Sequence, residues 1–477
     1  MDYSNFLGMR DELSLLVVIV LLFLYDTFGS AKSLKCFSAT ACVLLLAHTI
    51  FTIVPGEQVS LFGGMYQSGP ATSVIKTILN IGTLLVLIQA SSWIKNEDVV
   101  IRRGEYYVLT LITLLGMYLM TSSGNFLLFF LGLETASLPI TALIAMEKYK
   151  HDSHEAAAKY VFIAVFSSAL MLLGISYLYG IGGTLYFNDL SYMLSMSPLL
   201  IVGLVLFIAG LGFKLSLVPF HLWTADVYQG APTSVTAYLS VISKGAAAFT
   251  FMMILYKVFG SVECIWQGIL YALIILTITI GNLFAIRQQN LKRFLAFSSI
   301  SQAGYIMLGV ISNTGLGLTS LSYYVLVYIF SNLAAFGVIS VIENRTGKVN
   351  MDDYNGLYKT NPKLSIAMML AMFSLAGIPP FAGFFSKFFI FYAAAEQGFY
   401  ILVLIALINT VISLYYYLLV VKAMFIKQDE CVVENFRSDN ASRLSISLCV
   451  LGIVAIGLIS GIYDQIFEYS HGLLFGF

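Results

Sequence analysis

Long apolar stretches recur along the chain and are separated by short polar connections. A helix that spans a membrane needs about 20 mostly apolar residues. Fourteen stretches approach or exceed this length, at residues 11–29, 34–55, 72–94, 105–122, 124–146, 157–180, 198–221, 231–258, 264–286, 293–313, 316–343, 362–397, 399–427 and 442–468. The pattern predicts an all-α polytopic membrane protein with about 14 transmembrane helices.

Prolines interrupt two of these stretches, the seventh at Pro219 and the twelfth at Pro379-Pro380. A proline inside a helix lacks a donor and clashes with the carbonyl four residues back, so we expect helices 7 and 12 to be broken. Transporters built from inverted repeats carry broken helices at matching places in the two halves. The spacing predicts two inverted five-helix repeats between an N-terminal three-helix segment and a C-terminal helix. These four parts cover residues 1–104, 105–258, 259–427 and 428–477.

Composition agrees with a membrane protein. Hydrophobic residues make up 59% of the chain and charged residues 10%, against about 25% charged in soluble domains. The formal net charge is zero, so nothing indicates a nucleic-acid partner. The five cysteines are scattered without metal-ligand spacing, and we predict no metal site.

Basic residues indicate the orientation, because Lys and Arg concentrate in cytoplasmic loops. With the N-terminus outside, most of them fall in the inner connections, beginning with Lys32 and Lys35. The outer side keeps only Arg10, Lys76 and Lys257. Both termini are then expected on the outer, periplasmic side of a bacterial inner membrane. The acidic N-terminus lacks the basic region of a cleaved signal peptide, so we expect the first span to be retained.

Four ionisable residues lie deep inside predicted spans: Glu134, Lys214, Lys244 and Lys387. A charged side chain there costs several kcal/mol or more, so such residues are usually functional. A buried lysine can exchange between neutral and charged forms, and a nearby carboxylate can control that exchange. We therefore predict a proton relay, with Glu134 as the partner of one lysine and Lys214 as the first choice. Structural ion pairing between helices is the competing interpretation.

Two further residues are weaker candidates for the relay. Lys159 opens the sixth stretch, but Glu155 precedes it by four residues, so an ordinary surface ion pair would explain it equally. His221 follows the break at Pro219. Histidine titrates near neutral pH and could bridge two lysines, or it could be a hydrogen-bonded core residue.

Several motifs resemble the antiporter-like subunits of respiratory complex I, the NADH–quinone oxidoreductase. FKLSLVPFHLWTADVYQGAPTSVTAYLSVISK is similar to the family signature over the broken seventh helix and the eighth. LKRFLAFSSISQAGYIMLG resembles its second signature, LAGIPPFAGFFSKF its broken twelfth helix, and GNFLLFFLGLETASLP its fifth-helix segment with a buried glutamate. The resemblance covers nearly the whole chain. Within the family, DVYQGAP at residues 226–232 is similar to the N-type subunits.

The resemblance implies a proton-translocating subunit of the membrane arm without a redox centre of its own. NADH, FMN, iron–sulfur clusters and quinone would then be bound by other subunits. Its implied neighbours are M-type and K-type subunits, the lateral helix of the L-type subunit, and the lipid bilayer. Two positions depart from the family pattern: Ala225 replaces a common proline, and Gln302 replaces a common histidine. An amide can orient water but cannot carry the proton, so a titrating role at Gln302 is in doubt.

Two other functions compete with this one. A subunit of a multisubunit cation/proton antiporter, or of a membrane-bound hydrogenase complex, would share the fold and much of the lysine line. The residues expected around Tyr228–Pro232 in those complexes differ from the residues here. A scaffold that only joins its neighbours is a third possibility. Four lysines and a glutamate within spans disfavour it, because apolar residues would stabilise a scaffold at lower cost.

Overall fold

The structure is a computed structural model that describes residues 4–29, 36–427, 433–459 and 461–474. Lys32, Lys35 and Cys431 lie outside the described residues, as do both chain ends, at 1–3 and 475–477. Most of the described chain is helical, and its one sheet is a hairpin of two short antiparallel strands.

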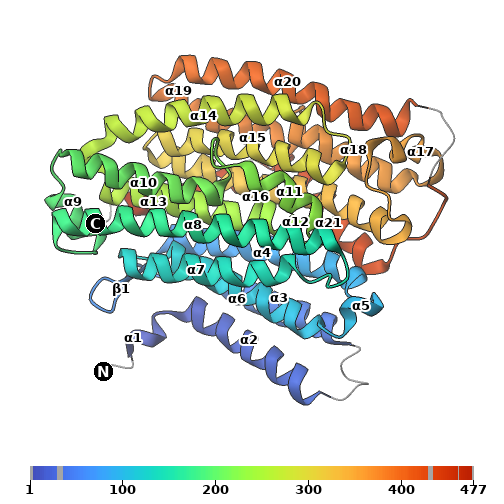
Figure 1. Cartoon of the computed structure of the whole chain (residues 1–477), viewed down its shortest axis with the longest axis horizontal. Helices are drawn as coiled ribbons and strands as arrows, with labels where there is room; N and C mark the ends of the chain where they lie inside the picture. The colour runs from blue at the N-terminus through green and yellow to red at the C-terminus, as the bar shows by residue number, and fades with distance from the viewer. Residues whose placement is uncertain (1–3, 30–35, 428–432, 460, 475–477) are drawn as a thin grey trace.

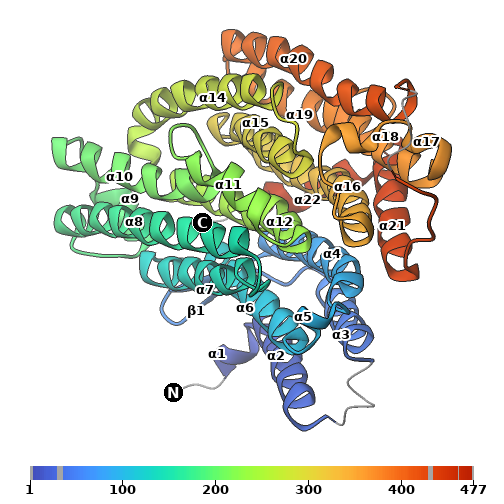
Figure 2. The same cartoon turned by 45° about the vertical axis from the view of Figure 1, so that its right-hand side comes forward.

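The N-terminal segment contains three long helices and the hairpin. Its elements are α1 (Ser4–Leu7), α2 (Arg10–Phe28), α3 (Phe37–Thr52), β1 (Val59–Leu61), β2 (Tyr66–Ser68), α4 (Pro70–Trp93) and α5 (Glu97–Val100). Helix α2 lies at the edge of the bundle in both views (Figures 1 and 2). Helix α4 is largely buried, and it therefore joins this segment to the rest of the molecule.

The next group of helices contains the first break. Its elements are α6 (Arg103–Thr121), α7 (Phe126–Ile144), α8 (His151–Gly182), α9 (Phe187–Met193), α10 (Pro198–Leu215), α11 (Leu222–Gly230), α12 (Thr233–Tyr238), the wide π-helical turn η2 (Leu239–Ser243) and α13 (Lys244–Val258). The predicted break in helix 7 is present, because α10 ends before Pro219 and α11 begins after it.

The remaining helices contain the second break. They are η3 (Gly260–Val262), α14 (Glu263–Ala285), α15 (Leu291–Ile311), α16 (Gly315–Thr346), η4 (Met351–Tyr354), α17 (Leu357–Thr360), α18 (Pro362–Ala376), α19 (Ala382–Glu396), α20 (Tyr400–Phe425), α21 (Asn440–Leu458) and α22 (Gly461–Leu474). Here too the predicted break is present, with Pro379-Pro380 between α18 and α19. The stretch predicted as one helix at 442–468 consists of α21 and α22.

Ten helices in the described part of the chain are long and apolar enough to cross a membrane. Helices α3 and α18 are apolar but shorter. Each of the fourteen predicted stretches coincides with one to three helical elements. The all-helical membrane fold is therefore confirmed, whereas the count of 14 spans and the inverted repeats stay predictions.

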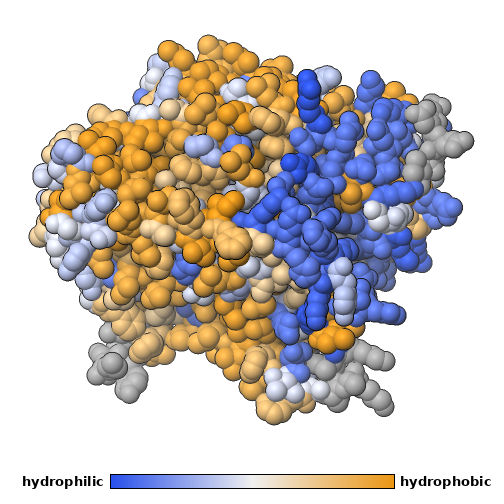
Figure 3. Space-filling view, viewed as in Figure 1, coloured by the Kyte–Doolittle hydropathy of each residue, from blue (hydrophilic) through white to orange (hydrophobic). Residues whose placement is uncertain are grey.

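The core of the bundle is formed by α12, α13, α15 and α16, which are buried over most of their length. Helices such as α8, α14 and α20 surround them and expose apolar side chains. Figure 3 shows a mainly hydrophobic surface, with hydrophilic residues gathered over the end where α5 and α17 lie. An apolar surface of this extent is expected where side chains face lipid.

Candidate functional site

Lys214 lies in the last turn of α10, next to the break. Ser216 follows in a left-handed conformation with φ 61°, which ends the helix. The Lys214 side chain is only 5% exposed. Its Nζ donates to Ser137 Oγ on α7 at 2.6 Å and to Tyr160 OH on α8 at 3.2 Å. The break thus places this ammonium group against two neutral hydroxyls.

Lys244 begins α13, directly after the π-helical turn η2. Such turns occur often at functional sites. The side chain is 2% exposed, and its Nζ donates to Ser299 Oγ on α15 at 2.7 Å. It also lies 5.6 Å from the ring centroid of Tyr228. This lysine therefore sits in the core, between the two groups of helices.

Lys387 lies on α19, beyond the second break. Its Nζ donates to Leu375 O at 2.9 Å and to Ala376 O at 3.0 Å. These carbonyls end α18, and the last carbonyls of a helix lack partners within the helix. They also carry the negative end of the helix dipole, which favours a cation. The second break thus creates the binding place for this lysine.

Gln302 connects the surroundings of Lys244 and Lys387. It lies one turn after Ser299 on α15, and its amide donates to Tyr417 OH at 3.1 Å and to Leu375 O at 3.4 Å. Tyr324 donates its hydroxyl to the Gln302 carbonyl oxygen. A cavity of about 10 Å³ reaches from Gln302 to Lys387 and includes Ser331, Ser374 and Ser386 in its lining. This volume is at the lower limit for one water molecule.

Glu134 on α7 is half-buried, and Ser168 on α8 donates to its Oε1. Among the described residues, no ion pair within 4.0 Å joins Glu134 to Lys214. Ser137, one turn further along α7, contacts Lys214 instead. The Glu134–Lys214 pairing therefore stays a prediction. In the structure, Ser137 is the α7 residue whose side chain contacts Lys214.

Lys159 belongs to an ion-pair cluster at the surface. Its Nζ lies 2.7 Å from Glu155 and 2.6 Å from Asp226, and its side chain is 40% exposed. Arg293 contacts the other Asp226 oxygen at 2.6 Å. The cluster lines a polar hollow of about 200 Å³. The surface pair with Glu155 that competed with a relay role is thus present, and the structure does not place Lys159 beside the buried lysines.

Lys159 and Arg293 lower the pKa of Asp226. Partial burial raises the pKa of this carboxyl, but the hydrogen bonds from Lys159 and Arg293 and their charges outweigh it. The net result is a pKa below the ordinary value for aspartate. Asp226 therefore stays ionised at neutral pH and ties α11 to α8 and α15.

His221 precedes α11 and is half-buried. Its Nδ1 is buried without a hydrogen-bond partner among the described side chains and backbone. The bridge between two lysines predicted from the sequence is not formed by direct hydrogen bonds here. His221 nevertheless lies at the break, between the elements that carry Lys214 and Lys244.

Two ion pairs, one buried and one partly buried, were not predicted from the sequence. Lys76 contacts Glu12 at 2.7 Å, although we assigned Lys76 to the outer side. Lys292 contacts Glu343 at 3.1 Å and donates to Ala231 O. These charges lie near the ends of apolar stretches, where sequence alone does not separate buried groups from flanking ones. In the described chain, no group of three or more His, Cys, Asp or Glu residues could hold a metal ion.

The chain is similar to known proteins over most of its length. Residues 123–413 match the family model described as NADH:quinone oxidoreductase/Mrp antiporter, TM. NADH-quinone oxidoreductase subunit N of Phocaeicola vulgatus is 59% identical over 465 residues, covering 97% of this chain and 98% of that protein. The subunit N of Azobacteroides pseudotrichonymphae is 56% identical over 481 residues, covering 99% and 100% of the two proteins.

Solved structures share the fold. A chain of respiratory complex I from Thermus thermophilus with bound aureothin has a TM-score of 0.80 and 29% identity, covering 95% of this chain and 98% of that one. A chain of the Mrp complex from Dietzia sp. has a TM-score of 0.84 at 22% identity and covers 100% and 98%, which shows the fold alone. Together with the buried lysines and the two breaks, these likenesses show that the chain belongs to the NADH:quinone oxidoreductase/Mrp antiporter family, within the group of NADH-quinone oxidoreductase N subunits.

Proposed function

We propose that the chain is a proton-translocating membrane-arm subunit of NADH-quinone oxidoreductase. Quinone reduction elsewhere in the complex would drive proton transfer along Glu134, Lys214, Lys244 and Lys387. The observation that carries the proposal is the bonding of the three lysines. Among the described residues, their ammonium groups contact neutral oxygens only, with no carboxylate within 4.0 Å. An uncompensated buried charge costs several kcal/mol, so these lysines can release a proton more readily than paired ones.

The proposed path from Lys244 to Lys387 uses α15. Lys244 donates to Ser299, and Gln302 follows one turn later. Gln302 donates to Leu375 O, the same carbonyl that accepts from Lys387. Because the amide does not titrate, Gln302 would hold the tyrosine hydroxyls and a bridging water in place while the proton moves past it.

The architecture supports the two inverted five-helix repeats. The third helices of the proposed repeats, α8 and α16, have 32 residues each, and each ends at a left-handed glycine, Gly183 or Gly347. The fourth member of each repeat is the broken pair, α10 with α11 and α18 with α19. We assign the first repeat to residues 105–258 and the second to 259–427.

We place the polar hollow around Asp226 at the inner mouth of this path. A space of about 200 Å³ holds several water molecules, because a cavity needs about 10–15 Å³ of such volume for each. Lys159 would act there as a surface charge that attracts and orders water, and His221 would pass protons inward from the break. In this arrangement the hydrophilic end in Figure 3 is the cytoplasmic end, and both termini lie on the periplasmic side of a bacterial inner membrane.

We further propose that M-type and K-type subunits are the neighbours and that the lateral helix of the L-type subunit crosses this chain. NADH, FMN, iron–sulfur clusters and quinone would be bound elsewhere in the complex. The names of the relatives support this setting. Because the fold is also similar to a chain of the Mrp complex, the alternative is a subunit of a cation/proton antiporter or of a membrane-bound hydrogenase complex.

The function is tested by isolating the chain with its natural partners. We expect an affinity-tagged chain to copurify with NADH- and quinone-handling subunits, identified by mass spectrometry. In sealed vesicles, the purified complex should then translocate protons when NADH and quinone are added, and a protonophore should abolish the pH gradient. Copurification with small antiporter subunits alone would support the alternative instead.

A further inference from the structure

The π-helical turn η2, which directly precedes Lys244, is bonded to a side chain of another core helix. Ser240 lies in this turn and is fully buried. Its hydroxyl donates to Ala237 O at 2.8 Å. Because a serine hydroxyl has one hydrogen, Ser240 Oγ can only accept from its further partner, which is Asn332 Nδ2 on α16 at 2.9 Å. The buried amide of Asn332 therefore holds η2 against α16.

A second helix contacts the same turn. In a regular α-helix each N–H bonds to the carbonyl four residues back, whereas in a π turn it bonds to the fifth. The change from one pattern to the other leaves one carbonyl of the turn without an N–H. Ser299 Oγ on α15 lies 3.5 Å from Ser240 O and accepts from Lys244 Nζ at 2.7 Å. The hydroxyl that binds the lysine thus also faces the backbone of the wide turn.

The width of η2 decides which way Lys244 points. Relative to a regular helix the turn holds one additional residue, and each residue of an α-helix turns by about 100°. A tightened turn would therefore rotate Lys244 relative to α12 and take its ammonium group away from Ser299. Sparsely populated backbone conformations persist where their surroundings hold them. For η2, the amide of Asn332 is part of that hold.

The residue before Asn332 contacts the second break. Ser331 donates its hydroxyl hydrogen to Val327 O at 3.0 Å, so its oxygen accepts from Ser374 Oγ on α18 at 2.7 Å. Ser374 Oγ in turn accepts from Gly383 N on α19 at 3.2 Å. Consecutive residues of α16 thus contact η2 and both helices of the second break.

We propose that Asn332 is a positioning residue for Lys244. It holds η2 in the wide form in which the lysine faces Ser299, and α16 joins this arrangement to the second break. The amide does not titrate, so it acts through η2 and carries no proton itself. The assignment rests on the proposed proton path, because the position of Lys244 matters for transfer only where this lysine takes part in it.

The first measurement is the structure of the assembled complex with Asn332→Ala, determined by electron cryo-microscopy. The change leaves the Ser240 hydroxyl bonded to Ala237 O, so we expect the complex to assemble. We expect η2 to tighten, with Lys244 Nζ beyond hydrogen-bond distance of Ser299 Oγ. A wide turn with Lys244 still bonded to Ser299 would overturn the proposal. This measurement does not involve proton translocation.

The second measurement is a double-mutant cycle on NADH-driven proton translocation, with Asn332→Ala, Ser240→Ala and the two together. Ser240→Ala removes the same contact from the other side, and it gives its own readout if Asn332→Ala does not assemble. Losing one hydrogen bond weakens the wide turn against the regular one, so we expect each single variant to be slower by about twofold to tenfold. The double variant should be no slower than the slower single one, since both changes remove one contact. Losses that multiply in the double variant would contradict an action through Ser240.

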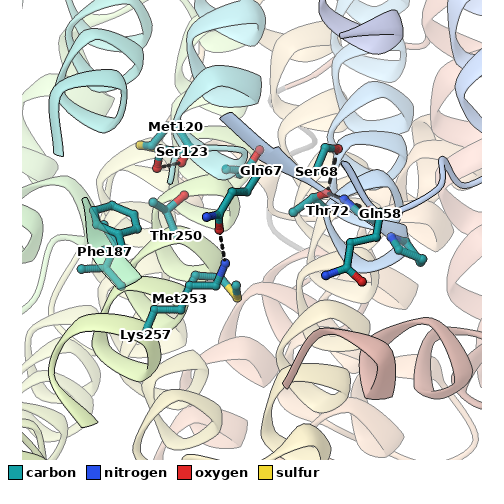
Figure 4. A pocket seen from close by; sticks show the side chains of 14 residues that line it. Gln58, Gln67, Ser68, Thr72, Met120, Ser123, Phe187, Thr250, Met253 and Lys257 are labelled. Carbon is teal, nitrogen blue, oxygen red and sulfur yellow. Dashed lines mark hydrogen bonds between the residues drawn. The ribbon is translucent and has the colours of Figure 1, made fainter. Parts of the chain in front are cut away.

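Thr250→Ala is the matched control on the helix that begins with Lys244. Thr250 is also buried, and its hydroxyl donates within its own helix. The side chain lines a separate cavity of about 30 Å³ at the hairpin, near Gln67 (Figure 4), so we expect wild-type turnover. A loss as large as that of Asn332→Ala would mean that any buried polar group has this effect, and the specific role of Asn332 would fall.

Lys244→Ala separates this inference from the proposed function. Wild-type turnover and proton yield in Lys244→Ala would contradict the proton path itself. A slow Lys244→Ala beside an Asn332→Ala that behaves as wild type would contradict the positioning role alone.

Discussion

Replacing Gln302 by leucine tests the link between the two halves of the lysine line. The amide has three partners: Tyr324, Tyr417 and the backbone oxygen of Leu375. After the change, Tyr417 keeps its contact with Ser298, and Leu375 O still accepts from Lys387. The one hydroxyl left without a partner is therefore that of Tyr324.

The size of the effect of Gln302→Leu follows from the burial of Tyr324. Tyr324 is 2% exposed, and a buried donor without a partner costs about 1–3 kcal/mol. In the proposed path the amide holds this hydroxyl while the proton passes, so we expect the same loss in the barrier of the transfer step. Because each 1.36 kcal/mol in a barrier is a factor of about ten in rate, turnover coupled to proton transfer should fall by about tenfold. Assembly should be normal, because leucine nearly conserves the volume of glutamine.

The assay is NADH-driven quinone reduction and proton uptake by vesicles that contain the assembled complex. Gln302→His restores the residue common in the resembled family, and we expect it to retain most of the activity. Gln288→Leu is the matched control, since the Gln288 side chain is partly exposed in the loop before α15 and donates to Phe284 O in α14. Wild-type rates in Gln302→Leu would refute the role of this amide in the path.

Two further predictions concern charged groups away from the lysine line. Lys76→Met leaves Asp11 and Glu12 as buried, less compensated charges, so we expect a loss of about 3–5 kcal/mol in stability. The double variant Lys76→Met/Glu12→Gln should recover much of this lost stability. The measurement is denaturation of the complex in mixed micelles, and no recovery in the double variant would contradict a coupled pair. Asp226→Asn should cost about 1 kcal/mol or less, because the wild-type pair is about one-third exposed. Since its pKa is depressed in the folded chain, the wild-type advantage should be complete above the ordinary aspartate pKa of about 4 and vanish as the pH falls through the folded value. A pH-independent difference between the two proteins would contradict this assignment.

Much of the fold could be predicted from the apolar stretches, because a membrane requires every spanning segment to satisfy its own backbone. The breaks at Pro219 and Pro379-Pro380 could also be predicted, since proline removes a donor that the helix needs. Lys214, Lys244 and Lys387 stood out because they interrupt apolar surroundings. All three are 5% exposed or less in the structure.

The contacts of these residues could not be predicted, because they depend on how each helix is rotated about its axis. Glu134 and Ser137 share one face of α7, and only the structure shows that Ser137 is the one that contacts Lys214. Asp11 and Glu12 begin the first apolar stretch, and only the structure shows that α4 and the hairpin cover them. For Lys159 the sequence left a relay role and a surface ion pair open, and the structure shows the ion pair.

The proton yield of a complex carrying Lys244→Ala is the most direct measurement. Protons translocated per electron would be determined in vesicles, beside quinone reduction. Lys95→Ala is the matched control, because Lys95 has a 67% exposed side chain and pairs with Asp439 at the surface. We predict that Lys244→Ala assembles normally but lowers the proton yield or the coupled turnover, whereas Lys95→Ala behaves as wild type. A wild-type yield and turnover in Lys244→Ala would contradict a proton path through the buried lysines.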